Sequence, residues 1–405
     1  MIDFIGSALS YIGPFLLVLG LVVTIHEFGH FLAARSLGIA VDRFSIGFGR
    51  AIATWKDKAG VEWRIGWLPL GGYVRFAGDE NAASVPDQAD LSAMRSEIER
   101  REGVEAVGRY FHFRPLWQRA VVVAGGPFAN FGLSIVLFAF LLMTVGETIL
   151  PARVDGVIPG SAAERAGFSR GDLVVEANGR KIKSFLELQQ MVSMRANVPM
   201  SFVVERGGRE LTLHATPERK TIVARIGGEQ KVGALGLRGL EQPGDRVVKR
   251  YNPLEALGGG VARTWDVLES TVYYLGRLIT GKETAEQLGG PLRIAQASGQ
   301  VAQAGAEGGT TPFAMVLGGL VALLGLTAVL SVGIGFMNLL PVPVLDGGHL
   351  LFYAYEAITR RPLAAKVQAA GYRVGLALLL GLMLFATWND LQQLRVFKFL
   401  GGLLS

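Results

Sequence analysis

Two histidines and a glutamate lie close together in the string His26-Glu27-Phe28-Gly29-His30. On a helix, His26 and His30 stand at positions i and i+4 on one face, so their imidazoles can hold one metal ion. Glu27 directly follows the first histidine and can act as a general base on a water molecule at that metal. The chain has only five histidines in 405 residues, which makes a chance match to this spacing improbable. The string therefore predicts a hydrolytic metal centre.

This string lies inside an apolar run that begins near Ile12 and continues beyond His30 as FLAA. Ionisable side chains inside a bilayer cost a few kcal/mol or more each, so they are kept where they have a function. A metal site would offset that cost. The alternative is a structural or proton-relay role for the same three side chains.

Composition indicates an integral membrane protein that also carries a soluble part. Half of the residues are hydrophobic and only 18% are charged. The net charge of +6 does not indicate nucleic-acid binding, because the basic residues form no stripe interleaved with aromatic residues. They fit contact with anionic lipid instead. The chain has no cysteine, so disulfides and thiolate metal sites are excluded and a metal must take N and O ligands.

Four apolar segments are each long enough to cross a bilayer, which takes about 20 apolar residues in a helix. They fall within 1–36, 117–146, 313–349 and 368–388. The first lacks a basic start and contains the metal motif, so we do not expect it to be a cleaved signal peptide. The predicted fold class is a polytopic α-helical membrane protein with an inserted β-rich domain.

Basic residues near the segment ends predict the orientation, because cytoplasmic loops are enriched in Lys and Arg. They cluster after the first segment, before the second, and between the third and fourth: Arg35, Arg43, Arg50, Arg109, Arg114, Arg119, Arg360, Arg361, Lys366 and Arg373. Both termini and the large region before the third segment are therefore expected outside. The first and third segments then run in the same direction, which brings their cytoplasmic ends to the same side.

A catalytic zinc site needs a third protein ligand, and Asp346 is the best candidate. It follows the third segment in the stretch Asn338-Leu-Leu-Pro341-Val-Pro343-Val-Leu-Asp346-Gly-Gly-His349. The alternative for Asp346 is an ordinary turn, since Asp-Gly-Gly is turn chemistry. His349 is either a partner of the ligands or, as we prefer, a plain interfacial residue.

The two prolines of this stretch interrupt the helix and leave backbone carbonyls unpaired. An extended strand at Pro341 and Pro343 would pair with an unwound substrate, because irregular backbone at membrane depth is tolerated where it lines a cavity. Asn338 would either hydrogen-bond such a substrate or cap the end of its helix. All three are therefore candidate substrate-binding residues.

HEFGH in the first segment, together with NLLPVPVLDGG after the third, resembles the site-2 protease family of intramembrane zinc metalloproteases. The stretch GGPFAN, from Gly125 to Asn130, is similar to that family as well, and the resemblance covers essentially the whole chain. Four segments with one PDZ domain between the second and third resemble its bacterial regulator-of-sigma-E protease branch (RseP type). The resemblance implies Zn²⁺ held by His26, His30 and Asp346, with Glu27 activating the water.

The resemblance also implies a setting and a substrate class. The protein would lie in the bacterial inner membrane, with its active site near the cytoplasmic side. Its substrates would be single-span membrane proteins, often anti-sigma factors, that another protease has first cut outside the membrane. The second cut would occur within the bilayer, as regulated intramembrane proteolysis.

The parts between the segments have simpler predictions. Residues 37–116 contain short strands or hairpins, which either dip into the membrane, as the resemblance implies, or pack on its surface. Residues 150–218 resemble a PDZ domain, which binds a peptide C-terminus or extended segment as an added strand. Gly167 and Phe168 are placed near its groove. Residues 219–312 are predicted as a connector with one strand and an amphipathic helix over 253–280, and 389–405 as a tail.

Two other functions fit parts of the sequence. A transporter would use intramembrane charges as an ion path, but the second and fourth segments are nearly free of charge. A PDZ scaffold with a vestigial metal site would have lost the glutamate or a ligand, whereas His26, Glu27, His30 and Asp346 are all present. We therefore predict a zinc endopeptidase.

Overall fold

The structure is a computed structural model that describes residues 2–78, 88–224, 228–239, 247–282 and 289–393. The chain divides into two compact units. The first comprises residues 1–138, 260–269 and 288–405, and the second comprises 139–259 and 270–287. Each unit is described by itself below.

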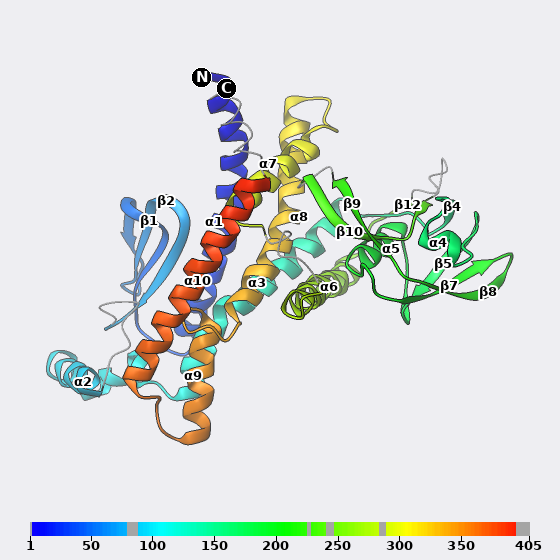
Figure 1. Ribbon diagram of the computed structural model, residues 1–405. Helices are drawn as coiled ribbons and strands as arrows, with labels where there is room; N and C mark the ends of the chain where they lie inside the picture. Colours follow the sequence, from blue (N-terminus) through cyan, green and yellow to red (C-terminus); the bar gives the residue numbers. More distant parts are fainter. Residues whose placement is uncertain (1, 79–87, 225–227, 240–246, 283–288, 394–405) are drawn as a thin grey trace, which may run out of the picture. The chain divides into compact units, whose positions relative to one another are not determined.

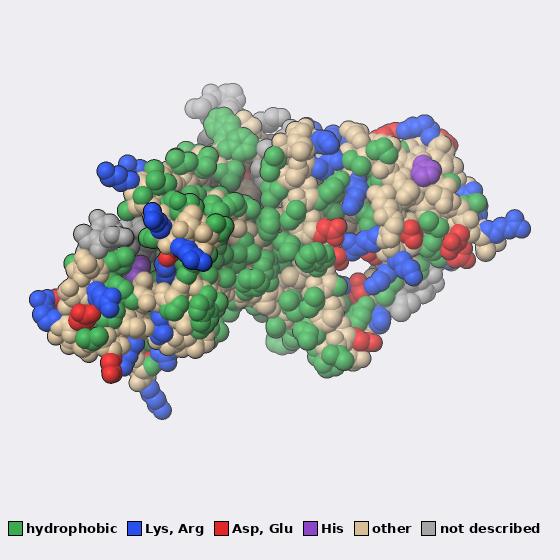
Figure 2. Space-filling model, turned by 90° about the horizontal axis from the view of Figure 1, so that it is seen from below, with side chains coloured by type: hydrophobic (Ala, Val, Ile, Leu, Met, Phe, Trp, Pro, Cys, Tyr) green, Lys and Arg blue, Asp and Glu red, His purple; other side chains and the backbone are tan. Residues whose placement is uncertain are grey.

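Four helices of the described chain are long and apolar enough to cross a membrane, as the sequence predicts. They are α1 (Ile2–Ser36), α3 (Leu116–Thr144), α8 (Pro312–Asn338) and α10 (Ala365–Gln393). Figure 1 shows them as the long helices of the first unit. Most of α10 has exposed apolar side chains such as Leu378 and Leu384, which suit a lipid environment better than water. Figure 2 shows hydrophobic side chains gathered over a broad area of one face, with Lys and Arg mostly outside it.

Glycines allow α1 and α3 to approach closely. A Cβ atom added to Gly29 would lie 2.6 Å from the Cβ of Ala129, and one added to Gly125 would lie 2.7 Å from the Gly29 carbonyl oxygen. Small residues at such a crossing let two membrane helices pack backbone against backbone. The crossing occurs within the HEFGH string itself, so the packing also places the site.

The segment after α1 forms an antiparallel hairpin of β1 (Val41–Lys56) and β2 (Glu62–Phe76), in agreement with the predicted strands. Figure 1 shows this hairpin beside α1. Its base is buried, with Phe44 only 1% exposed, whereas Ile52 and Trp67 near its tip are 70% and 63% exposed. The charged stretch that follows is the helix α2 (Gln88–Glu102) and two short 3₁₀ turns, η1 (Val104–Arg109) and η2 (Phe111–Phe113).

The chain before and after α8 contains two helices that periodicity did not predict. The helix α7 (Pro291–Ala306) packs on α8 through Gly305, where an added Cβ would lie 2.7 Å from the Cβ of Ala322. Asp390 of α10 accepts the backbone N–H groups of Gly290 and Arg293 at 2.9 and 3.0 Å and so caps the start of α7. The helix α9 (Asp346–Thr359) begins at the predicted ligand.

The second unit is rich in short strands. A four-stranded sheet has the order β6-β5-β7-β8, and three further strand pairs are β3 with β12, β4 with β11, and β9 with β10. The bounds are β3 Glu147–Ile149, β4 Val154–Val157, α4 Ala162–Arg165, β5 Leu173–Ala177, β6 Arg180–Lys181, α5 Phe185–Ser193, β7 Met200–Arg206, β8 Arg209–Ala215, β9 Glu218–Ala224, β10 Gly228–Ala234, β11 Leu237–Gly239 and β12 Val247–Lys249. The core of this unit includes Leu235, which lies beyond the predicted boundary at 218. The stretch KVGALGLRG is thus part of this unit rather than of a separate connector. The helix α6 (Pro253–Ile279) follows it and begins with a capping box at Asn252.

An ion pair between a fully buried carboxylate and a partly exposed arginine links the ends of two strands in the second unit. Arg206 donates to both oxygens of Asp172 at 2.6 and 2.8 Å, and the Asp172 side chain is 0% exposed. Burial raises the pKa of Asp172, but the hydrogen bonds from Arg206 and from the Ser169 backbone outweigh it, so the pKa lies below its ordinary value. Asp172→Asn should destabilise this unit by roughly 2 kcal/mol at neutral pH, because the Arg206 charge loses its partner.

Hydrogen exchange on the full chain measures this effect, with amides of β5 and β7 expected to exchange on the order of 30-fold faster in Asp172→Asn. Asp155→Asn is the matched control, since the Asp155–Arg170 pair at 3.0 Å is 39% and 78% exposed and should contribute little. The stabilisation by Asp172 is present above the ordinary carboxyl pKa of about 3.9 and is lost as pH falls through its lower folded pKa. Equal exchange in Asp172→Asn and the native chain at pH 7 would contradict the prediction.

Candidate active site

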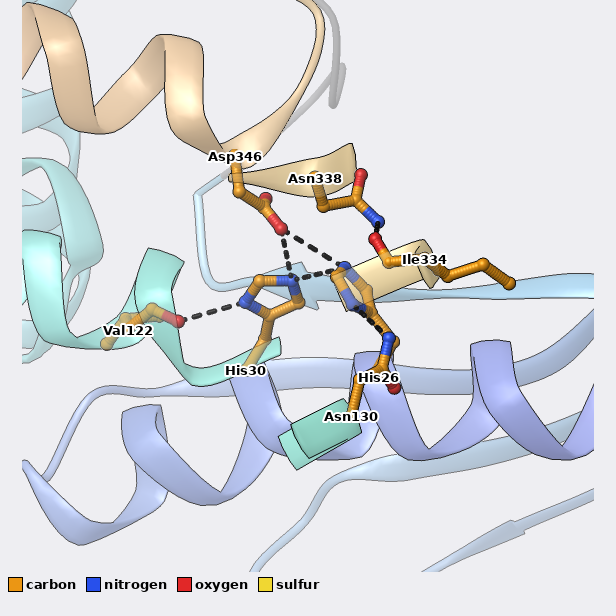
Figure 3. Close-up of polar contacts among 7 residues, drawn as sticks. All are labelled: His26, His30, Val122, Asn130, Ile334, Asn338 and Asp346. Carbon is orange, nitrogen blue, oxygen red and sulfur yellow. Dashed lines mark hydrogen bonds and ion pairs between the residues drawn. The ribbon is translucent and has the colours of Figure 1, made fainter. Parts of the chain in front are cut away.

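The structure brings together the three residues predicted to bind metal. His26 and His30 lie one turn apart on α1, and Asp346 is the first residue of α9 (Figure 3). The Nε2 atoms of His26 and His30 are 3.2 Å apart, and they lie 3.1 and 3.6 Å from Oδ2 of Asp346. One ligand atom from each residue falls within 4.8 Å of the others. Two nitrogens and one oxygen therefore converge on one point from parts of the chain more than 300 residues apart in sequence.

The donor set fits a zinc ion. Asp346 Oδ2 is buried and has no hydrogen-bond partner in the described part of the chain, which leaves it available as a ligand. His26 is only 7% exposed, and a cluster of this kind is buried at a cost unless a cation or proton compensates it. Two imidazoles and one carboxylate are the ligands of several catalytic zinc sites, which leave a fourth position open. The residues present thus suit zinc.

Residues of helix α3 contact both histidines at the Nδ1 atom of each ring. Nδ1 of His30 donates to the Val122 carbonyl at 2.9 Å, which leaves the Nε2 atom of His30 directed at the site. Nδ1 of His26 lies 3.3 Å from Nδ2 of Asn130, a residue that is 0% exposed. Sequence reasoning did not identify Val122 or Asn130 as site residues. The only signal was the GGPFAN stretch, which was noted for its resemblance alone.

Gly126 of α3 leaves the space that the two imidazoles occupy. An added Cβ there would lie 2.6 Å from Cε1 of His30 and 2.9 Å from Cε1 of His26. Real Cβ contacts do not come this close, so any larger residue at position 126 would displace the rings. Gly126 is therefore a part of the site that sequence reasoning did not name.

Glu27 faces the second strand of the hairpin. An added Cβ on Gly72 of β2 would lie 3.3 Å from Cγ of Glu27, and the Val74 backbone forms a hydrogen bond with the Glu27 carboxylate. Glu27 does not belong to the group of three converging ligand atoms. The carboxylate thus lies next to the candidate metal site without being one of its ligands, between α1 and a strand.

The stretch between α8 and α9 is a series of turns and not the extended strand that its prolines suggested. The Val342 N–H donates to Leu340 at 2.7 Å and the Leu345 N–H donates to Val342 at 2.8 Å, so Pro341 and Pro343 lie in tight turns. An added Cβ on Gly348 would lie 2.4 Å or less from the Val342 carbonyl and Pro343. The turns fold onto the start of α9, and Gly347 and Gly348 permit this. Their effect is to present Asp346.

Asn338 ends α8, and its side chain Nδ2 donates to the Ile334 carbonyl of its own helix at 3.1 Å (Figure 3). This contact corresponds to the alternative in which Asn338 caps the end of its helix. It leaves the Oδ1 atom of Asn338 available to other partners. His349 lies on the first turn of α9 and accepts or donates a hydrogen bond with the Tyr372 hydroxyl at 3.0 Å. This hydrogen bond links α9 to α10.

Of the two predicted peptide contacts of the second unit, Phe168 lies in the interior and Gly167 lies at a turn. Phe168 is 5% exposed and belongs to the hydrophobic core. Gly167 has φ +86°, and its carbonyl accepts a hydrogen bond from Arg206 at 2.7 Å. The Phe168 side chain therefore lies in the core, and Gly167 has no side chain, so a peptide contact at either residue would be through the backbone. The sequence pattern did not distinguish core from groove because both are apolar in a small β-rich domain.

A histidine pair on a membrane-spanning helix, a carboxylate third donor and an adjacent glutamate define a membrane-bound metalloprotease. Comparison with known proteins gives the same result, since residues 14–382 match peptidase family M50. The chain belongs to this family of zinc metalloproteases.

Individual relatives extend over nearly the whole chain. The metalloprotease MmpA of Caulobacter vibrioides is 52% identical over 390 residues, covering 96% of this chain and 97% of that protein. A relative from Agrobacterium fabrum is 43% identical over 389 residues, with 96% and 97% covered. One from Rhizobium meliloti is 41% identical over 387 residues, with 95% and 98% covered. The names of both describe zinc metalloproteases. The predicted enzyme class and cofactor are thereby confirmed.

Proposed function

We propose that this enzyme cleaves single-span membrane proteins within the bilayer, as an RseP-type site-2 protease. The observation that carries the proposal is the depth of the site. His26 precedes the end of α1 at Ser36 by ten residues, or about 15 Å of helix, and a bilayer core is about 30 Å thick. A peptide bond must therefore enter the membrane to reach these ligands.

His26, His30 and Asp346 would hold the zinc ion. When bound, zinc supplies Lewis-acid chemistry that polarises a peptide carbonyl and makes water acidic enough to deprotonate near neutral pH. Glu27 would take the proton from the attacking water and later return it to the leaving amine. Its position next to the ligands, outside the ligand set, suits that role.

The position of strand β2 supports a substrate that binds as an added strand. A peptide bond inside a helix is shielded by its own hydrogen bonds, so a transmembrane substrate must unwind before attack. An unwound segment can pair with an available strand. In the hairpin, Gly72 and Val74 lie beside Glu27, so a segment held along this strand would pass the general base. Asn338, Pro341 and Pro343 would also contact the substrate, with the Asn338 oxygen accepting a hydrogen bond from it.

The proposal also covers the second unit and the orientation of the chain in the membrane. We propose that the unit is a PDZ domain outside the cytoplasm, where it takes an extended segment or C-terminus of a protein, and that the active site lies toward the cytoplasmic side. The clusters of Arg and Lys around α3 and between α8 and α10 support this orientation. An anti-sigma factor or similar regulator, trimmed outside by another protease, is the proposed substrate.

The test is cleavage of a purified single-span protein co-reconstituted in lipid vesicles, with the cut mapped by mass spectrometry. We expect a cut inside the apolar segment, and we expect His26→Ala to lose both zinc and cleavage, because removing one of three ligands weakens a zinc site severely. A matched substrate with its apolar segment replaced by a soluble helix should not be cut. Cuts confined to residues outside the apolar segment would sink the proposal.

A further inference from the structure

Asn130 is a buried amide that directly contacts one candidate zinc ligand. Its side chain is 0% exposed and lies 3.3 Å from Nδ1 of His26 (Figure 3). Its Oδ1 atom is buried and has no hydrogen-bond partner among the described residues. Buried polar groups that lack a partner are rare in folded proteins, so this one calls for an explanation.

The chemistry of His26 supplies that explanation. Nε2 of His26 faces His30 and Asp346, so in a metal site Nε2 must carry a lone pair. The neutral ring then carries its proton on Nδ1, which must donate a hydrogen bond. The two ends of an amide have nearly the same shape, so Asn130 can turn its oxygen toward Nδ1. That orientation gives the ring proton an acceptor, and it moves Nδ2 to the position that Oδ1 now occupies.

The surroundings hold Asn130 in place for this contact. Ser331 of α8 donates from Oγ to the Asn130 backbone carbonyl at 2.8 Å, and Ser331 is itself 0% exposed. Gly335, one turn further on α8, allows close packing, since an added Cβ would lie 3.1 Å from the Asn130 Cβ. The backbone and Cβ of Asn130 are thus held from α8, a third membrane helix, which places its side chain beside His26.

The other histidine, His30, makes the same kind of contact through its own Nδ1 atom. The carbonyl of Val122, about two turns before Asn130 on α3, accepts the Nδ1 proton of His30 at 2.9 Å. We propose that Asn130 is a positioning residue that accepts the Nδ1 proton of His26 and thereby fixes the tautomer and ring orientation that bind zinc. This inference rests on the proposed metal site. Partners of this kind typically change metal affinity 10- to 100-fold when they are removed.

The experiment measures zinc affinity of the full chain in detergent, by titration against a competing chelator, so no catalytic activity is required. Asn130→Leu keeps the branched shape of the side chain, although leucine is larger, and it removes the acceptor; we expect zinc binding about 10- to 100-fold weaker. Asn130→Asp keeps an acceptor and cannot donate, so we expect affinity within about threefold of the native chain. Ser134→Ala is the matched control on the same helix. Ser134 is 0% exposed and bonds Thr264 at 3.2 Å, away from the ligands.

Each outcome decides the proposal. Native zinc affinity in Asn130→Leu overturns the proposal. A zinc affinity in Asn130→Asp that is as weak as in Asn130→Leu also overturns it, because that result would mean that the native amide donates to His26. If Asn130→Leu shows no cooperative unfolding transition, Asn130→Asp alone decides, and zinc affinity about tenfold or more below that of the native chain overturns the proposal. His26→Ala in the same titration separates the two levels of inference. Full zinc binding there refutes the metal site itself, whereas lost binding there with native affinity in Asn130→Leu refutes only the role of Asn130.

Discussion

Glu27→Gln is expected to lower the rate of peptide cleavage by a factor on the order of 10³ to 10⁴ while zinc stays bound. Glutamine has the shape of glutamate but cannot take a proton from water. Glu27 is outside the group formed by His26, His30 and Asp346, so the ligand set remains complete. Single-turnover cleavage of a membrane-embedded substrate and metal analysis of the same preparation provide the two measurements.

Glu210→Gln makes the same chemical change on the exposed strand β8 of the second unit and should leave cleavage unchanged. If Glu27→Gln loses zinc along with activity, Glu27 acts on the ligands and is not merely the base. If Glu27→Gln cleaves at the native rate, another group activates the water, and the assignment of the base is wrong.

Gly126→Ala is expected to abolish zinc binding, and with it cleavage, although alanine favours a helix by about 1 kcal/mol over glycine. The added methyl would lie 2.6 Å from Cε1 of His30 and 2.9 Å from Cε1 of His26, so the rings must move away from Asp346. Both ligands are affected by one carbon atom, and a displaced ring cannot bind the shared ion. The measurements are zinc content after purification and thermal unfolding.

Gly132→Ala is the matched control for this substitution. It lies on the same helix, and an added Cβ at Gly132 meets nothing within 4 Å. We expect native zinc content and a slightly more stable helix there. A Gly126→Ala protein that keeps its zinc would show that the two rings have room to shift, and that the close packing of α1 on α3 does not define the site.

The sequence alone indicated the candidate ligands because their relation is local or chemical. The i and i+4 spacing of His26 and His30 holds on any helix, and the need for a third donor in a chain without cysteine indicated Asp346. The four spans followed from length and hydropathy, since a bilayer demands a long apolar run. These properties do not depend on which elements become neighbours.

The tertiary structure decided which groups surround those ligands. Asn130 and Val122 reach the histidines, and Gly126 makes room for them, only because α3 crosses α1 at Gly29. The approach of β2 to Glu27 and the turns that present Asp346 likewise depend on packing between segments far apart in the chain. Phe168 shows the same limit, since its apolar character suits a groove and a core equally and only packing decided for the core. Contacts of this kind arise from shape complementarity between whole elements, and no local spacing in the sequence encodes them.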